Sequence, residues 1–137
     1  MNAANKLMMA SLNVSDMPKA KEFYSEKLGF KITTDYRQDD NNWWVSLELP
    51  EGGATLTLSR ASMSPDAIKS DTLTLYFETN DVEAAHKELK DKNVDVSDIT
   101  DDLFGQGSGV KWLNVADPDG TRIFFVAKHE KTARTPF

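Results

Sequence analysis

The chain of 137 residues contains no cysteine and only two histidines. The absence of cysteine excludes disulfides, thiolate nucleophiles and cysteine-based metal sites. No apolar run is long enough to cross a bilayer, and the first residues lack the basic and then apolar pattern of a signal peptide. We therefore expect a cytoplasmic protein that has no membrane partner.

Basic residues are also scarce relative to acidic ones. The chain has 16 Lys and Arg against 22 Asp and Glu, which gives a net charge of −6 and an isoelectric point near 4.9. This charge argues against nucleic acid as a partner and leaves neutral or cationic small molecules as the easier ligands. A hydrophobic fraction of 39% is sufficient for one compact domain with a core.

The second half of the chain repeats the first. The segment Trp44–Gly52 and the strand after it reappear at Trp112–Gly120, 68 positions later. Upstream, Asp16 and the helix that follows it match Asp81 and its helix. Each half is expected to contain a strand, a helix, two strands, a turn and a last strand. The duplication predicts two similar modules with a pocket between them.

Local signals divide the chain. Asp16 and Asp81 are expected to cap the two helices, which Gly29 and Asn93 end. The second module is expected to include a short strand near Val94–Val96. The chain is therefore divided into a first module (1–60), a linker (61–71), a second module (72–128) and a tail (129–137).

Three stretches carry a resemblance to a known family. The stretches SDMPKAKEFYSEKLGFKI, TNDVEAAHKELKDKNVDV and WLNVADPDGTRIFF resemble the vicinal oxygen chelate superfamily, which includes glyoxalase I, bleomycin-resistance proteins and extradiol dioxygenases. The likeness covers Leu7 to Lys128. It implies an α+β fold of two βαβββ modules, whose curled mixed sheets enclose a cleft with the helices outside. It also implies a homodimer, and the modules are free to pair within one chain or across the dimer.

Enzymes of this superfamily hold a divalent metal with four side chains, usually His, Glu or Gln. The resemblance places these ligand positions at Met9, Thr74, Phe124, and either Leu56 or Thr57. A thioether, a hydroxyl or a phenyl ring does not replace imidazole or carboxylate ligands. We therefore expect no metal and no cofactor at this site. The two histidines, His86 and His129, are expected to lie outside the cavity.

Alternation along the strands predicts which side chains face the cavity. Residues in phase with the former ligand positions are aromatic or polar, whereas the opposite phase is almost purely apolar and suits packing against helices. Phe104, in the glycine-rich loop 98–109, is a candidate lid residue, although the loop also fits an ordinary connection. The predicted ligand-binding residues are Met9, Trp44, Glu48, Thr57, Thr74, Tyr76, Glu78, Phe104, Trp112 and Phe124.

Three functional hypotheses follow from this lining. The first is a binding protein without a metal centre that sequesters an aromatic or cationic drug or metabolite, as the bleomycin-resistance branch does. The alternative is a metal-dependent lyase, dioxygenase or thiol transferase of the same superfamily. A third is metal-free acid/base chemistry by Glu48 or Glu78. For each aromatic or polar side chain taken alone, a core or solvent-facing role is the competing interpretation.

Overall fold

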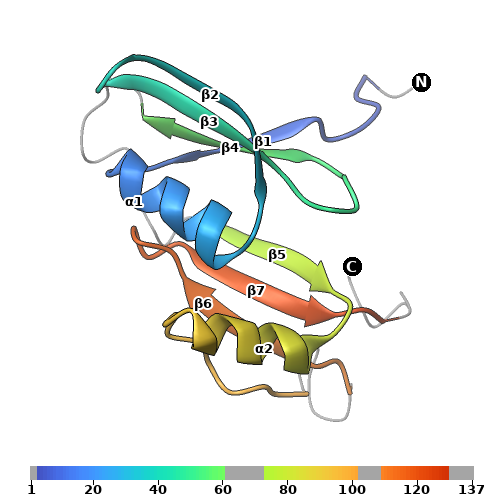
Figure 1. Cartoon of the computed structure of the whole chain (residues 1–137). Coiled ribbons are helices and arrows are strands. Elements are labelled where there is room, and N and C mark those ends of the chain that lie inside the picture. The colour runs from blue at the N-terminus through green and yellow to red at the C-terminus, as the bar shows by residue number, and fades with distance from the viewer. Residues whose placement is uncertain (1–2, 61–72, 102–108, 130–137) are drawn as a thin grey trace. The chain divides into compact units, whose positions relative to one another are not determined.

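The computed structural model describes residues 3–60, 73–101 and 109–129. The chain divides into two compact units, Met1–Lys69 and Ser70–Phe137. Each unit holds one mixed sheet and its helix, which confirms the predicted α+β class (Figure 1). None of the helices within these described ranges has the length and apolar character needed to cross a membrane.

The first unit contains a four-stranded sheet in the order β1-β4-β3-β2. Strand β1 runs parallel to β4, and the other neighbours are antiparallel. Helix α1 packs against β4 and continues directly into a π-helical segment, η1. The elements are β1 (Met9–Asn13), α1 (Met17–Lys21), η1 (Glu22–Lys27), β2 (Lys31–Asp39), β3 (Asn42–Glu48) and β4 (Thr55–Arg60).

Local chemistry sets both ends of this helical stretch. The Asp16 side chain accepts a hydrogen bond from the Lys19 backbone N–H at 3.1 Å, and Pro18 occupies the first turn. Gly29 follows with a φ of 80°, a conformation that glycine adopts without steric cost. The helix covers the apolar face of the sheet, where Leu47 and Leu58 are fully buried. The predicted cap and stop are thus confirmed.

The second unit contains a three-stranded sheet in the order β5-β7-β6. Strand β5 runs parallel to β7, β6 runs antiparallel to β7, and α2 packs on β6 and β7. Asp81 caps α2 through the Ala84 N–H at 2.9 Å, and Asn93 follows the helix with a φ of 62°. The elements are β5 (Thr74–Thr79), α2 (Val82–Asp91), β6 (Trp112–Ala116) and β7 (Arg122–Ala127).

The prediction of a short strand near Val94–Val96 is wrong, because these residues form no strand. The chain instead meets the edge of β6 slightly later, where Thr100 and Trp112 exchange two backbone hydrogen bonds. Past this bridge the contact with β6 continues through Ser97, whose N–H donates to the Asn114 carbonyl at 3.0 Å and whose hydroxyl accepts the Asn114 N–H at 2.9 Å. The bridge and Ser97 therefore stand where the first unit has β2.

The turn between β2 and β3 is short, because β2 extends to Asp39 and β3 begins at Asn42. Arg37 pairs with Trp43, and Asp39 pairs with Asn42 across the turn. The Asp39 carboxylate accepts hydrogen bonds from the Asn41 N–H and the Asn42 amide, which lowers the pKa of Asp39. These bonds close a tight turn that leaves only two residues outside the strands.

Candidate functional site

The face of the first sheet opposite the helix carries two rows of polar and aromatic side chains. Residues opposed across paired strands share a face, so the strand register defines each row. Both rows cross all four strands in the order β1, β4, β3, β2. One row is Asn13, Ser59, Trp44 and Tyr36, and the other is Ser11, Thr57, Ser46 and Thr34.

Trp44 and Tyr36 form the aromatic end of this face. Their ring centroids lie 4.5 Å apart at an interplanar angle of 26°, and Trp44 is 42% exposed. Tyr36 is not among the predicted ligand-binding residues. A bulge between Ile32 and Thr34 moves Tyr36 onto the face of Trp44, although simple alternation from Ile32 puts it on the helix side.

The remaining predicted residues of the first unit share the same face but differ in burial. Thr57 is buried, and its hydroxyl has no hydrogen-bond partner among the described residues. Met9 and Glu48 are exposed at the far end of the sheet from Trp44. Pairing of Glu48 with Lys31 places a cation on the neighbouring strand. The structure therefore brings Trp44 and Thr57 into one surface and leaves Glu48 at its margin.

The corresponding face of the second sheet carries a continuous stack of three rings. Phe124 lies between Tyr76 and Trp112, with centroid distances of 4.9 Å and 5.0 Å. The interplanar angles are 28° and 30°, and Tyr76 is 48% exposed. We call this set the aromatic stack. All three residues lie on the side of the sheet away from α2.

Groups of opposite charge lie toward the two ends of the β5–β7 ladder, on either side of the Tyr76–Phe124 pair. Thr74 pairs with Arg122 at one end, and the Arg122 guanidinium donates to the Asn114 amide oxygen at 2.9 Å. Glu78 pairs with Val126 at the other end. Thr74 and Glu78 are four positions apart on β5, a separation of about 13 Å along an extended strand. A flat surface with a cation at one end and an anion at the other can orient a dipolar ligand.

A small pocket of about 210 Å³ adjoins the Glu78 end of the aromatic stack. Tyr76, Glu78 and His129 line it together. His129 is part-buried, with Nδ1 2.9 Å from the Ala127 carbonyl oxygen. His129 comes close to this pocket because the chain continues beside the end of β5 after β7, where the Lys128 N–H donates to the Thr79 carbonyl at 3.0 Å. His86 is partly packed on α2, and the candidate lid residue Phe104 lies outside the described residues.

The positions that hold a metal in the enzymes of the resembling superfamily do not fit one here. Met9, Thr57 and Thr74 offer a thioether and hydroxyls, and Phe124 offers a ring at the centre of the aromatic stack. These groups are poor ligands for borderline or hard divalent ions. In the part of the chain that the structure describes, no three His, Asp or Glu side chains cluster as a metal site.

The chain consists of two repeated units. In each unit a helix covers one face of a mixed sheet and aromatic rings lie on the other face, so this is an α+β protein built from two similar modules. A model of the Glyoxalase/Bleomycin resistance protein/Dioxygenase superfamily matches residues 6–125. The chain belongs to this superfamily, which confirms the resemblance seen in its sequence.

Several proteins of known structure or sequence are similar to this chain. TnmS3, an antibiotic binding protein from Streptomyces sp. CB03234, is 24% identical with a TM-score of 0.78, over 94% of this chain and 100% of that one. A superfamily member from Sphaerobacter thermophilus is 26% identical with a TM-score of 0.75, over 91% and 98% of the two chains. Protein YetH from Bacillus subtilis is 24% identical over 78% of this chain and 85% of its own.

Proposed function

We propose that the protein binds a flat aromatic or cationic drug or metabolite without a metal centre and without catalysis. The aromatic stack Tyr76–Phe124–Trp112 is the observation that carries this proposal. The resemblance places Phe124 at the position of a metal ligand in the enzymes of the superfamily, and we propose that a ring contact takes the place of metal coordination there.

The physical basis of the proposal is the large apolar area that stacked rings offer at little conformational cost. Aromatic pairs contribute roughly 0.5–1.5 kcal/mol beyond the area they bury. Ring faces also attract cations, and the net charge of −6 favours a positively charged ligand. A few polar groups at the margin, such as Glu78 and Arg122, would fix the orientation of the ligand.

The comparisons support a binding role. TnmS3, whose fold the chain shares, is described as an antibiotic binding protein. The superfamily also includes bleomycin-resistance proteins. We propose that the ligand is bound by a homodimer, as the resemblance implies, because two-fold symmetry would present two identical sets of aromatic faces.

One observation favours a second candidate function. Glu78, Tyr76 and His129 line the same pocket at the end of the aromatic stack. A carboxylate and an imidazole in one pocket are the side chains that general acid/base catalysis uses most often. A metal-free enzyme would place the reacting atoms of its substrate in this pocket and its ring system on the stack.

The test of the binding function is calorimetric titration with bleomycin, proflavine and berberine, after the protein has been treated with a chelator. We expect saturable binding without metal by at least one probe. Phe124→Leu removes the central ring and should weaken this binding roughly tenfold, the value of one lost stacking contact. Phe125→Leu makes the same change on the helix side of β7, outside the pocket of Glu78 and His129, and should leave the affinity unchanged.

Two results would contradict the proposal. The first is binding that requires stoichiometric Zn²⁺, Ni²⁺, Mn²⁺ or Fe²⁺, which would return the protein to the metal-dependent enzymes. The second is an equal loss of affinity in Phe124→Leu and Phe125→Leu, which would show that the aromatic stack affects binding only through the stability of the fold. If the protein converts a bound probe to a product and His129→Gln abolishes this turnover, the acid/base enzyme is favoured.

A further inference from the structure

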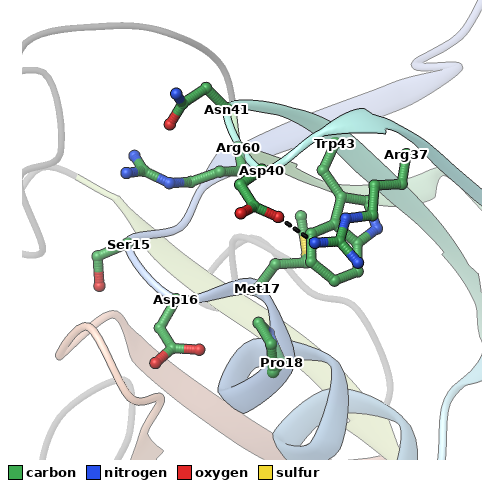
Figure 2. A pocket seen from close by; sticks show the side chains of 9 residues that line it. All are labelled: Ser15, Asp16, Met17, Pro18, Arg37, Asp40, Asn41, Trp43 and Arg60. Carbon is green, nitrogen blue, oxygen red and sulfur yellow. Dashed lines mark hydrogen bonds and ion pairs between the residues drawn. The ribbon is translucent and has the colours of Figure 1, made fainter.

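The first unit has a cavity on the opposite side of its sheet from Trp44 and Tyr36. Its volume is about 390 Å³, within the range of small-molecule sites. Figure 2 shows its lining side chains, which come from the start of α1, the β2–β3 turn and the end of β4. Asp16 and Met17 line the helix side, and Arg37, Trp43 and Arg60 line the sheet side.

The strand register builds the sheet side of this pocket. Arg37 pairs with Trp43 across β2 and β3, and Trp43 pairs with Arg60 across β3 and β4. The indole N–H of Trp43 donates to the Asp35 carboxylate at 2.7 Å. The guanidinium carbon of Arg37 lies 4.5 Å from the centre of the indole ring. The wall is therefore held in place before any ligand arrives.

Two acidic and two basic side chains line the pocket, Asp16, Asp40, Arg37 and Arg60, and they differ in their partners. Asp40 forms an ion pair with Arg37, drawn as a dashed line in Figure 2. The Asp16 carboxylate accepts the Lys19 N–H and caps α1. Among the residues that the structure describes, the Arg60 guanidinium has no hydrogen-bond or ion-pair partner. A half-buried guanidinium with unused donors at a pocket wall is a recognition element for an anion.

We propose that this pocket binds a small organic monocarboxylate, with the carboxylate on the Arg60 guanidinium. A carboxylate matches the planar fork of arginine with two parallel hydrogen bonds. A doubly charged anion such as phosphate is disfavoured, because the carboxylates of Asp16 and Asp40 line the same pocket. The apolar part of the ligand meets Met17, Pro18 and Trp43.

This site is separate from the proposed aromatic site. Trp43 and Arg60 lie on the helix side of the first sheet, whereas Trp44 lies on the opposite side, because consecutive residues of a strand face opposite ways. The aromatic stack belongs to the other unit. Either proposal can therefore fail while the other holds.

The experiment is a titration of the ¹⁵N-labelled full chain followed by NMR, with the indole N–H of Trp43 as the local reporter. The probes are 3-methylbutanoate and benzoate, with 3-methylbutylamine and inorganic phosphate for comparison. We expect saturable shifts of Trp43, Asn41 and Ser15 with at least one carboxylate, no shifts with the amine, and weaker binding of phosphate. Arg60→Gln should weaken carboxylate binding at least tenfold, the effect of a lost charge-assisted hydrogen bond.

The control variant is Lys90→Gln, which removes one positive charge from the exposed surface of α2 in the other unit. It should bind the carboxylate as the unmodified protein does. Absence of shifts with both carboxylates overturns the proposal, and so does equal weakening in Arg60→Gln and Lys90→Gln. Tighter binding of phosphate than of either carboxylate would overturn the assignment of a monocarboxylate. A spectrum of Arg60→Gln that matches the parent outside the pocket shows that the variant is folded.

Discussion

At the scale of single residues, Asp35 is the best connected carboxylate on the helix side of the first sheet. It accepts hydrogen bonds from the Lys21 ammonium and from the Trp43 indole. The hydrogen bond from Lys21, aided by that from Trp43, holds the pKa of Asp35 below its ordinary value of 3.8, against the opposing effect of burial. Because Lys21 lies on the helical stretch and Asp35 on β2, the pair ties the helix to the sheet.

The first residue-scale prediction concerns the pH dependence of this contact. A lowered pKa in the folded state means that Asp35 stabilises the protein fully above pH 3.8, and that the stabilisation is lost as the pH falls below that value toward the pKa of the folded state. Asp35→Asn should therefore lower the free energy of unfolding at pH 7 by about 1 kcal/mol or less, because the side chain is 35% exposed.

Urea unfolding of Asp35→Asn and of the parent protein at pH 7, and again below pH 3.8, measures this difference. We expect the two proteins to become equally stable at the lower pH. Asp95→Asn, which changes an exposed carboxylate between α2 and β6, is the matched control and should follow the parent throughout. A difference that stays constant with pH would show that Asp35 acts through packing and not through its charge.

At the scale of elements, the two helices are begun by the same device. Asp16 and Asp81 both adopt an extended backbone, with φ of −137° and −149°, and both accept a backbone N–H three residues later. The units differ at the outer edge of the sheet: β2 flanks β3 in the first unit, whereas among the described residues of the second unit the outer edge of β6 meets the Thr100–Trp112 bridge and Ser97 and no named strand. The duplicated sequence thus preserves helix initiation more closely than it preserves the outer strand.

The cap of α2 gives the element-scale prediction. Asp81→Ala should lower the stability of the second unit by about 1 kcal/mol, because the Ala84 N–H loses its acceptor. Asp81→Ser keeps an acceptor oxygen and should retain most of the stability. Amide exchange of the first turn of α2 measures the local effect. Equal amide exchange rates in Asp81→Ala and Asp81→Ser would mean that the capping hydrogen bond contributes nothing to the stability of the first turn of α2.

At the scale of the whole molecule, the net charge of −6 acts on any ligand that approaches. Binding of a cationic probe such as berberine should weaken as the ionic strength rises from about 0.02 M to about 0.3 M, because salt shortens the range of the attraction. A neutral flat compound bound at the same site should show little change. Calorimetry at the two salt concentrations tests this, and equal salt dependence for both compounds would exclude long-range attraction.

Several features of the protein were determined by its sequence alone. The offset of 68 positions predicted two similar units, and Asp16, Asp81, Gly29 and Asn93 marked the ends of the helices. Alternation along β4, β5 and β7 also sorted the side chains onto the two faces of each sheet. These signals are local, because a cap, a turn or a period of two depends only on residues close together in the chain.

Only the tertiary structure decided which side chains meet. The bulge in β2 reverses the alternation and stacks Tyr36 on Trp44, and the register of three strands aligns Arg37, Trp43 and Arg60. The pairing of the chain after β7 with the end of β5 brings His129 to the pocket of Tyr76. Pairing between distant strands depends on register, and one inserted residue changes every contact beyond it, so local patterns in the sequence do not contain this information.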